Sequence, residues 1–501
     1  MKDKNKFRSL IVQVTVLLIA LSLYILARSY FLFHVHLQTL ERVFGIIFFA
    51  SELFIMIHAF GFFLDIINQN RKKVEPRRVE PGEDASVAIL IPSRHEPKQV
   101  VYNTLLTCQK MSYPNKTLYL LDDSSIESYK QEARELAEIF GAELFTRKTN
   151  RGAKAGLVND VMATLSEKYI VVFDADQNPM PGFLTMILPF LEGDDRLALV
   201  QTPQFYTNTD VSHVAMVANV QQAVFFEYVC EGKASNESMF CCGTNVVIRS
   251  AALREVGGFD ESTLTEDLAT SLRLHRKKWK TLYYNKAYTF GMAPEDLGAY
   301  FKQQARWATG NVQLIHKLFV LFFTHIRALS PVQWFEYMIT ATYYFIGWAY
   351  IFLITGPILY IFFGFPSFFM NQSVYVLTFV PYLLLSLTVY YSSMKRRKYT
   401  QLNVFKAQML TMLTIPIYMR ASLQGLFNLK KVFNVTRKGG IINASVLSVW
   451  PQLLLWMIHL SALTWGVLKL YQDPSISLGM NVFWVGFHFF IFCGIFYFNW
   501  E

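Results

Sequence analysis

Cysteine, charge and repetition are all scarce in this sequence. Only 17% of its 501 residues are charged, and it has no low-complexity tract, no internal repeat and no targeting motif. Its five cysteines are Cys108, Cys230, Cys241, Cys242 and Cys493. They show neither metal-ligand spacing nor a disulfide framework, which excludes a zinc-ribbon or a disulfide-stapled fold and suits a reducing compartment.

Apolar residues are abundant instead. Hydrophobic residues make up 53% of the chain and aromatic residues 16%, and the mean hydropathy is +0.26. This composition is too apolar for a wholly soluble protein, yet 47 basic and 37 acidic residues remain. We therefore expect membrane-spanning segments around a polar catalytic unit, in a chain long enough for two or three domains.

Six apolar runs of roughly 20 residues predict six membrane spans. They cover residues 9–31, 43–67, 334–363, 374–393, 445–469 and 481–499. Basic clusters at residues 2–8, 71–78 and 395–398 all fall on one side of a six-span arrangement. The positive-inside rule then predicts a multi-pass plasma-membrane protein whose two termini and polar domain are cytoplasmic. The same clusters account for the formal charge of +10 without a nucleic-acid partner.

Strand-like and helix-like segments alternate between the second and third spans. Strand patterns lie at residues 86–92, 117–121, 143–145 and 169–173, and helical patterns lie at 98–111, 127–140 and 153–166. Such alternation predicts a doubly wound α/β fold with a parallel sheet. Ligands of such sheets bind beyond the carboxyl ends of the strands. Because Asp122 and Asp174 stand at two of these ends, we expect them to share one crevice.

Four short motifs occur in order within this polar segment. They are Asp122-Asp123, Asp174-Ala175-Asp176, Thr265-Glu266-Asp267 and Gln303-Gln304-Ala305-Arg306-Trp307. An isolated carboxylate pair is most often a solvated turn, but four ordered motifs around one crevice indicate an active site. Asp174 and Asp176 follow a strand on one extended turn, where their hard oxygen ligands suit Mg²⁺ or Mn²⁺.

In order and wording the motifs resemble those of the processive family 2 glycosyltransferases, the group that contains bacterial cellulose synthase, chitin synthase and hyaluronan synthase. The resemblance implies a GT-A-type α/β glycosyltransferase domain inserted in an α-helical transmembrane bundle of about six spans. It divides the chain into two N-terminal transmembrane helices at 1–71, a cytoplasmic GT-A domain with an interfacial helix at 72–330, and four transmembrane helices at 331–501. The third part would also contain an interfacial helix at 400–430 and a gating loop at about 429–442.

The resemblance implies a nucleotide-sugar donor at the strand ends. Asp174 and Asp176 would ligate the divalent cation, which stabilises charge on the leaving diphosphate. Asp122 and Asp123 would contact the uridine side of the donor.

Two further positions belong to the donor by the same resemblance. Lys154 lies in the stretch 151–156, where a cation and small residues open a helix and suit a phosphate-bearing ligand. An ordinary loop and helix cap is the alternative there. Glu96 ends the stretch 92–96, which resembles the family's opening loop around the nucleobase.

The stretch Thr265-Glu266-Asp267 resembles the family motif whose aspartate is the general base. Asp267 would accept the proton of the acceptor hydroxyl, a contribution of about 10²–10⁴-fold, and Glu266 would line the acceptor site. One in-line displacement would invert the anomeric centre and give a β-linkage. In the alternative, Thr265 caps a helix at 268–277, and the two roles are compatible.

The stretch 240–244 resembles the segment of cellulose synthases that lies against the end of the polymer. Cys241 replaces a phenylalanine of that segment, so this part of the acceptor wall would differ. Cys242 and Gly243 would face the polymer. Simple packing of the two thiols is the alternative, and a nucleophilic cysteine is not expected because inverting transfer needs no covalent intermediate.

The last of the four motifs resembles the family's mark of processivity. Gln303 and Arg306 would bind the donor diphosphate, and the indole of Trp307 would stack on a sugar ring of the polymer. A tryptophan that only anchors the protein at the membrane interface is the alternative.

The stretch 433–439 resembles the gating loop of cellulose synthases and related β-glucan synthases. Thr436 and Lys438 would reach the donor when this loop closes and excludes water. A short interfacial linker with snorkelling cations is the alternative. The loop favours UDP-glucose as the donor.

Together the motifs predict an inverting, processive β-glucan synthase that polymerises glucose from UDP-glucose with Mg²⁺ or Mn²⁺ and translocates the polymer across the lipid bilayer. A chitin- or hyaluronan-like synthase that uses UDP-N-acetylglucosamine is the first alternative, and a non-processive lipid-carrier glycosyltransferase is the second. A pure transporter would leave the carboxylate motifs unexplained. Because the chain stops at Glu501, we expect none of the cyclic di-GMP-binding domain of bacterial cellulose synthase, as in a mixed-linkage or capsular glucan synthase.

Overall fold

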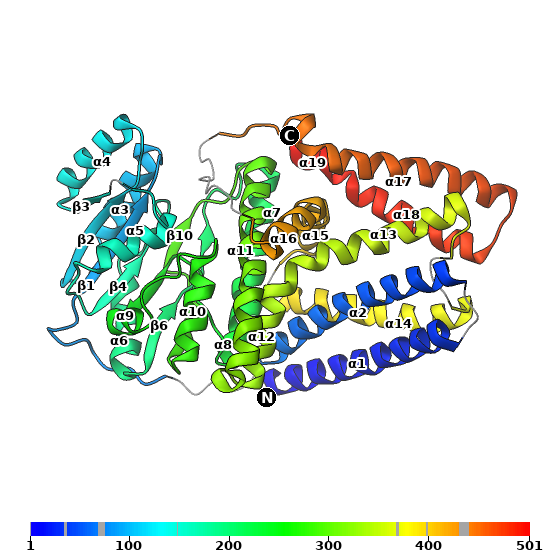
Figure 1. The fold of residues 1–501 in the computed structure, drawn as a ribbon, viewed down its shortest axis with the longest axis horizontal. Coiled ribbons are helices and arrows are strands. Elements are labelled where there is room, and N and C mark those ends of the chain that lie inside the picture. The colour runs from blue at the N-terminus through cyan, green and yellow to red at the C-terminus, as the bar shows by residue number, and fades with distance from the viewer. Residues whose placement is uncertain are drawn as a thin grey trace.

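A sheet-containing body and a bundle of long helices lie side by side in the computed structural model (Figure 1). The structure describes residues 2–34, 38–68, 76–147, 149–366, 370–396, 399–429 and 440–500. The sheet-containing body is formed by the middle of the chain, and the long helices come from both ends of the sequence. This arrangement matches the predicted insertion of an α/β domain between spans.

Six helical segments are long and apolar enough to cross a membrane, as predicted from the sequence. They are Leu10–His34, Thr39–Asn68, Pro331–Phe363, Gln372–Met394, Val446–Gln472 and Ile476–Asn499. The corresponding helices are α1 (Lys2–His34), α2 (Thr39–Asn68), α12 (Pro331–Thr342) with α13 (Ile346–Phe363), α14 (Gln372–Arg396), α17 (Val446–Gln472), and α18 (Ile476–Phe492) with α19 (Gly494–Asn499). Their apolar length agrees with a multi-pass membrane protein.

The central sheet has seven strands in the order β3-β2-β1-β4-β8-β6-β9. The strands are β1 (Val87–Ser93), β2 (Lys116–Asp122), β3 (Glu143–Thr146), β4 (Tyr169–Val172), β6 (Leu197–Gln201), β8 (Val246–Arg249) and β9 (Lys280–Tyr283). The first four are parallel, and each lies within a residue or two of its predicted range. A second sheet joins β5 (Asn178–Pro179), β10 (Thr289–Gly291) and β7 (Phe205–Tyr206).

The prediction of a parallel sheet is wrong for one strand, since β8 runs antiparallel to both β4 and β6. The reason lies in the residue that precedes it. The Asn245 N–H donates to the Val172 carbonyl at 2.9 Å, and the Asn245 carbonyl accepts from the Thr202 N–H at 3.1 Å. The chain therefore enters β8 at the edge where β4 and β6 end, and the stretch 240–244 before it lies along the crevice.

Helices cover both faces of the central sheet. On one face, α3 (Lys98–Gln109), α4 (Glu127–Phe140) and α6 (Phe183–Gly193) contribute to one apolar core. On the other face, α5 (Ala153–Met162), α9 (Ser250–Glu255) and α10 (Glu266–Arg276) contribute to a second core. Helix α5 is shorter than the predicted 153–166. Leu120 of β2 is fully buried in the first core, and Leu90 of β1 is fully buried in the second. Successive side chains of a strand point to opposite faces of the sheet, so each strand can contribute to both cores.

Further helices lie where the sheet-containing body meets the spans. They are α7 (His213–Val224), the π-helix η1 (Phe225–Cys230), α8 (Glu231–Ser235), α11 (Leu297–Thr324), α15 (Gln401–Leu413) and α16 (Ile415–Leu426). In Figure 1, α11 stands between the sheet and the spans, roughly across the direction of the long helices. The predicted interfacial helix 400–430 is two helices, which meet at Thr414 just before the proline at Pro416.

Helix α11 contacts its two neighbours through glycines. A Cβ at Gly310 would stand 2.6 Å from the backbone N of Thr265, which directly precedes α10. A Cβ at Gly425 of α16 would stand 2.5 Å from the Thr309 carbonyl O of α11. Both glycines thus permit backbone contacts that no larger residue would allow, and these contacts fix α11 between the catalytic motifs and the span-side helices.

Candidate active site

Asp122 lies at the carboxyl end of β2, as the sequence predicted. It is 3% exposed, and its Oδ1 accepts a hydrogen bond of 3.2 Å from the Ser124 N–H. Burial raises the pKa of Asp122, and the contacts from Ser124 partly oppose this effect. The side chain therefore stands at the edge of the crevice in a polar but enclosed position.

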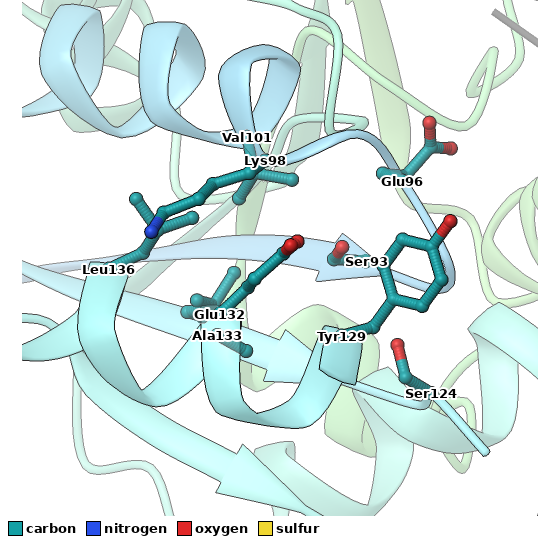
Figure 2. Close-up of a pocket in the computed structure, with 10 residues that line it drawn as sticks. Ser93, Glu96, Lys98, Val101, Ser124, Tyr129, Glu132, Ala133 and Leu136 are labelled. Atoms are coloured by element: carbon teal, nitrogen blue, oxygen red, sulfur yellow. The ribbon is translucent and has the colours of Figure 1, made fainter. Parts of the chain in front are cut away.

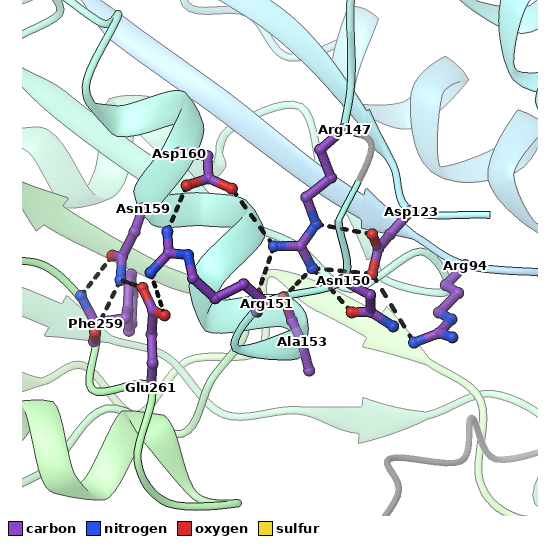
Figure 3. A network of polar contacts seen from close by, with 10 residues as sticks. All are labelled: Arg94, Asp123, Arg147, Asn150, Arg151, Ala153, Asn159, Asp160, Phe259 and Glu261. Atoms are coloured by element: carbon purple, nitrogen blue, oxygen red, sulfur yellow. Dashed lines mark hydrogen bonds and ion pairs between the residues drawn. The ribbon is translucent and has the colours of Figure 1, made fainter. Parts of the chain in front are cut away.

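Asp123 is engaged in a bidentate ion pair that the sequence did not reveal (Figure 3). Arg147 donates from Nε to Oδ1 at 2.8 Å and from Nη2 to Oδ2 at 3.0 Å. The same guanidinium donates to the carbonyls of Arg151 at 2.6 Å and Ala153 at 2.8 Å. Arg147, whose side chain is 6% exposed, therefore connects the end of β2 to the loop that opens α5. Its only sequence signal is a cation between β3 and the stretch 151–156.

Lys154 brings two of the predicted motifs together. Its Nζ donates to Asp174 Oδ1 at 2.5 Å and to the Gly243 carbonyl at 2.7 Å. Burial opposes the charge on Lys154, but Asp174, Glu266 and the hydrogen bond to Asp174 outweigh it, so its pKa is raised. Lys154 is thus a fixed cation between the strand-end carboxylates and the stretch 240–244.

Asp174 and Asp176 occupy a turn after β4. The Gln177 N–H donates to the Asp174 carbonyl at 2.9 Å and closes this turn, while the Asp174 N–H donates to Thr244 Oγ1 at 2.9 Å. The Asp174 side chain is 41% exposed, whereas Asp176 is 7% exposed. Among the described residues no group of three His, Cys, Asp or Glu side chains is placed to hold a metal ion. The two carboxylates suit one divalent cation whose remaining ligands come from water or a bound molecule.

Asp267 lies one residue inside α10, next to Glu266. Its Oδ1 accepts a hydrogen bond of 2.8 Å from the Leu268 N–H. Burial and the charge of Glu266 raise the pKa of Asp267 to about 7, although the Leu268 N–H, Lys154 and Arg306 lower it. A carboxylate with this pKa is suited to general-base chemistry near neutral pH. Asp267, the residue predicted to be the base, lies beside Gly243, with Lys154 and Arg306 nearby.

The predicted cap at Thr265 is absent. Thr265 is the N-cap residue of α10, but within the described part of the chain its buried hydroxyl has no hydrogen-bond partner. The Leu268 N–H, the usual partner of an N-cap side chain at 265, donates to Asp267 Oδ1 at 2.8 Å instead, and Thr265 lies against Gly310. The contact with α11 thus fixes the start of α10 in place of a side-chain cap.

Gly243 separates Lys154 from the base. Its φ is +82°, a left-handed conformation that favours glycine, and a Cβ there would stand 3.1 Å from Asp267 Oδ2. The absence of a side chain leaves space beside the base. The Cys242 N–H donates to Gln201 Oε1 at 2.8 Å, and burial raises the pKa of the Cys242 thiol. A raised pKa keeps this thiol protonated near neutral pH, and the absence of a nucleophilic role stays a prediction.

Helix α11 brings Gln303, Arg306 and Trp307 toward the crevice. The Tyr206 hydroxyl, which sequence reasoning missed, hydrogen-bonds to Gln303 and lies close to Asp176 and Arg306. Burial raises the pKa of Tyr206, and the nearby Asp176 charge adds to this effect. Trp307 is half-buried against an apolar cluster that includes residues of α11, α13 and α16. Gln303 and Arg306 therefore lie near the carboxylates, and Trp307 lies toward the span-side helices.

Glu96 lines a pocket between β1 and α4 (Figure 2). The pocket is also lined by Ser93, Lys98, Ser124, Tyr129 and Glu132. Figure 2 shows the ring of Tyr129 between Glu96 and Ser124. A flat ring and several polar groups suit a planar polar ligand. Tyr129 had no signal in the sequence, because it lies in an ordinary-looking helical pattern.

Two predicted donor contacts, Thr436 and Lys438, lie outside the described residues. The structure brings together Lys154, Asp174, Asp176, Gly243, Asp267, Gln303 and Arg306, while Asp122 lies at the carboxyl end of the nearby strand β2. It places Glu96 in a pocket beyond the end of β1 and engages Asp123 with Arg147.

Comparisons with known proteins agree with this geometry. Residues 169–394 match a family described as glycosyl transferase family group 2. A UDP-forming cellulose synthase catalytic subunit of Pseudomonas fluorescens is 29% identical over 422 residues, which cover 81% of this chain and 55% of that protein. The corresponding subunit of Xanthomonas axonopodis is 31% identical over 285 residues, which cover 55% of this chain and 38% of that protein. The chain thus spans about half or less of the length of these relatives.

A solved structure has the same fold. The mannosyltransferase PcManGT of Pyrobaculum calidifontis, in complex with GDP-Man and Mn²⁺, matches with a TM-score of 0.53 at 15% identity. The match covers 76% of this chain and 99% of that chain. At this identity the likeness concerns the fold alone. The predicted fold class, a GT-A-like α/β domain flanked by six candidate spans, is confirmed.

Proposed function

On the premise that this chain resembles the family 2 glycosyltransferases of the cellulose-synthase group, we propose that it is a membrane-embedded, inverting, processive β-glucan synthase. Its donor is UDP-glucose, and the polymer leaves through the span bundle to the other side of the membrane. The catalytic domain and both termini are cytoplasmic in this proposal, in line with the basic clusters beside the spans.

The convergence around Lys154 carries the proposal. Lys154 contacts Asp174 at 2.5 Å and the Gly243 carbonyl at 2.7 Å, and the site of a Gly243 Cβ is 3.1 Å from Asp267 Oδ2. A candidate donor site, a candidate acceptor wall and a candidate base therefore meet within a few side-chain lengths. A transporter or a structural protein has no need for such an arrangement.

On the donor side, we assign the nucleobase to the pocket that contains Glu96 and Tyr129, and we assign Asp122, at the end of β2, to the uridine side of the donor. Asp174 and Asp176 would hold one Mg²⁺ or Mn²⁺, which when bound stabilises negative charge on the leaving diphosphate. Lys154 supplies a further positive charge beside Asp174. These groups are set in position before the donor arrives, which favours transition-state stabilisation over binding alone.

Asp267 acts on the acceptor. The terminal hydroxyl of the glucan attacks the anomeric carbon of glucose, the bond from that carbon to the diphosphate breaks, and UDP leaves with the electron pair. Asp267 takes the proton of the attacking hydroxyl. Arg306, which lowers the pKa of Asp267, lies close enough to complement the charge of the carboxylate before it accepts the proton. The single displacement inverts the anomeric centre.

On the acceptor side, Gly243 leaves room for the terminal sugar beside the base, and Glu266 and Cys242 line the same wall. Trp307 provides a flat apolar surface at the end of the crevice nearest the span-side helices. Thr436 and Lys438, in the stretch 433–439, are assigned to closure over the donor by resemblance alone.

Purified protein with individual UDP-sugars and Mg²⁺ or Mn²⁺ tests this proposal. We expect polymer and UDP from UDP-glucose only, with the polymer degraded by a linkage-specific β-glucanase. If polymer forms from UDP-N-acetylglucosamine alone, that nucleotide sugar is the donor and UDP-glucose is not. Products of one or two sugars on a lipid would contradict processivity. Vesicles with the catalytic domain outside should accumulate the polymer inside, where added glycanase does not reach it.

A further inference from the structure

A buried cluster of charged side chains lies where the sheet-containing body meets two of the spans. It consists of Asp65 near the end of α2, Lys233 in α8 and Glu336 in α12, which are 5%, 3% and 6% exposed. Figure 1 shows α8 beside α12 at this boundary. Charges are rarely buried to this extent unless they are paired, so the cluster calls for a specific explanation.

Glu336 is bonded through both of its carboxylate oxygens. Lys233 Nζ donates to Glu336 Oε2 at 2.7 Å and to the Glu336 carbonyl at 3.2 Å. Asn236 Nδ2 donates to Glu336 Oε1 at 2.6 Å, and Asn68 Nδ2 donates to Asn236 Oδ1 at 3.0 Å. These contacts connect α2, the segment after α8, and α12 in one polar network.

Asp65 adds a second carboxylate to this network. Among the described residues, its buried Oδ1 has no hydrogen-bond partner. The carboxylate lies against the backbone of Gly232, since a Cβ at Gly232 would stand 2.2 Å from Asp65 Oδ1. Asp65 and Glu336 are therefore two buried acidic side chains near Lys233, which is ion-paired with Glu336. Any residue larger than glycine at 232 would push α2 away from α8.

The same lysine also contacts the wall to which we assign the acceptor. Lys233 Nζ lies 5.9 Å from the ring centroid of Phe240, within the range of a cation–π interaction. The Lys233 carbonyl accepts from the Ser238 N–H at 2.9 Å and from Ser238 Oγ at 3.0 Å. These bonds fix the turn between α8 and the stretch 240–244. The position of Gly243 beside the base thus depends on the docking of Lys233 onto the spans.

We propose that Lys233, paired with Glu336, is a positioning residue that aligns the acceptor wall with the span bundle. The inference rests on the proposed function, since alignment matters only if a growing polymer passes from the crevice into the spans. Lys233 touches neither donor nor base. Its effect is therefore on how long the polymer stays engaged, and the chemistry of a single transfer is affected little.

Stability alone is a poor explanation of the cluster. Removing two charges from water costs free energy that the ion pair recovers only with good geometry, and apolar residues in such places often stabilise a fold equally well. Lys233 contacts the third span through Glu336 and the acceptor wall through Phe240, and its neighbour Gly232 packs on Asp65 of the second span, so the cluster fixes direction as well as attraction. An apolar substitute would fill the space without fixing the register of these three elements.

The test measures polymer length for Lys233→Met, Lys233→Arg and Gly232→Ala. We expect the mean length to fall roughly fivefold in Lys233→Met and Gly232→Ala, as for a disrupted coupling network, with UDP affinity unchanged. Lys233→Arg keeps the charge and should restore most of the length. The exposed Lys110, on the far side of the sheet, supplies Lys110→Met as the matched control, which should behave like the unmodified protein.

Variants that lose folded protein would lower the yield of polymer without shortening it, so length separates alignment from stability. Normal length in Lys233→Met, or a raised donor KM without a change in length, would overturn the proposal. Docking is measured independently of activity by a short bis-thiol reagent that bridges Asn68→Cys and Asn236→Cys. Bridging should succeed in the variant that carries both cysteines, and it should fail when Gly232→Ala is added to that variant. If the unmodified protein makes no polymer while bridging behaves as expected, the proposed function fails and the docking stands.

Discussion

The two walls of the crevice are built by different means. On the donor wall, charged side chains are paired with one another: Arg147 with Asp123, and Lys154 with Asp174. On the acceptor wall, the backbone of Gly243 and the buried thiol of Cys241 lie beside Asp267, and the indole of Trp307 packs on apolar neighbours toward the span-side helices. The donor wall is fixed by ion pairs, and the acceptor wall is largely free of charge apart from Glu266 and Asp267.

This difference suits the tasks that we assign to the two walls. A donor binds in the same pose in every cycle. Protein charges that are already in position before it binds therefore stabilise the same developing charge each time. A polymer that advances after every transfer is better served by flat and weakly bonding surfaces, because strong hydrogen bonds would hold it in one register. The following experiments change one wall at a time.

The largest effect should come from the base between the walls. Asp267→Asn should lower polymer formation by about 10²–10⁴-fold, because the amide cannot take the proton of the acceptor hydroxyl. UDP affinity should stay near that of the unmodified protein, since the base acts on the acceptor. Asp195→Asn, at an exposed position far from the crevice, is the control. Substantial synthesis by Asp267→Asn would remove Asp267 from this role.

The pH dependence of the unmodified protein should follow the same carboxylate. With a pKa of about 7, Asp267 is mostly protonated at pH 6 and mostly ionised at pH 8. Single-turnover rates should therefore rise about tenfold between these values and level off above. A flat profile over this range would show that Asp267 ionises well below neutrality.

Stability should show the opposite trend for this residue. The pKa of Asp267 is raised in the folded protein from an ordinary 3.8, so the folded state retains a proton that the unfolded state loses. Its contribution to stability is present below about pH 4 and is lost as the pH rises toward 7. Asp267→Asn should thus raise the melting temperature in detergent at pH 8 more than at pH 4. An equal change at both values would contradict the raised pKa.

A smaller effect is expected from the donor wall. Arg147→Lys retains a charge but cannot form the bidentate bond to Asp123 or reach both loop carbonyls at once. We expect the KM for the donor to rise about fivefold, the equivalent of roughly 1 kcal/mol, with little change in polymer length. Exposed Arg276, replaced by lysine, is the control. A shorter polymer with an unchanged KM would place Arg147 on the acceptor side.

The smallest effect should come from the thiol of the acceptor wall. Cys242→Ser should leave both rate and polymer length within about twofold, because burial keeps this thiol protonated and no covalent step requires it. The activity of the protein after treatment with a thiol-directed reagent should equal its activity before treatment. A loss of more than tenfold would indicate a chemical role for sulfur that the inverting mechanism lacks.

The positions that were predicted best are those where a chemically suitable residue follows a clear secondary-structure pattern. Asp122 and Asp174 were placed at strand ends because hydrophobic runs with turns after them identify strands reliably, and both lie there. Six apolar segments long enough to span a membrane were predicted, and the described residues form six helical segments of that length and composition. The ends of strands and the apolar spans can therefore be predicted from the local sequence.

What the sequence did not reveal depends on contacts between distant segments. The reversed direction of β8 is set by bonds from Asn245 to β4 and to Thr202, which no local pattern encodes. Arg147 and Tyr129 lie in an ordinary loop and an ordinary helix, and only the fold brings them to the crevice. The cap expected from Thr265 is replaced by the bond from the Leu268 N–H to Asp267, and Thr265 packs instead against Gly310, 45 residues later in the chain.

That contact at Gly310 has a consequence for how such a chain can evolve. The obstacle to a side chain at 310 includes the backbone N of Thr265 at 2.6 Å, so shrinking the side chain at 265 would not make room. No single compensating substitution is then available, and the same holds for Gly425 against the Thr309 carbonyl. Related proteins that differ in product or linkage should therefore keep both glycines. A saturation library should yield almost no folded variants with another residue at either position.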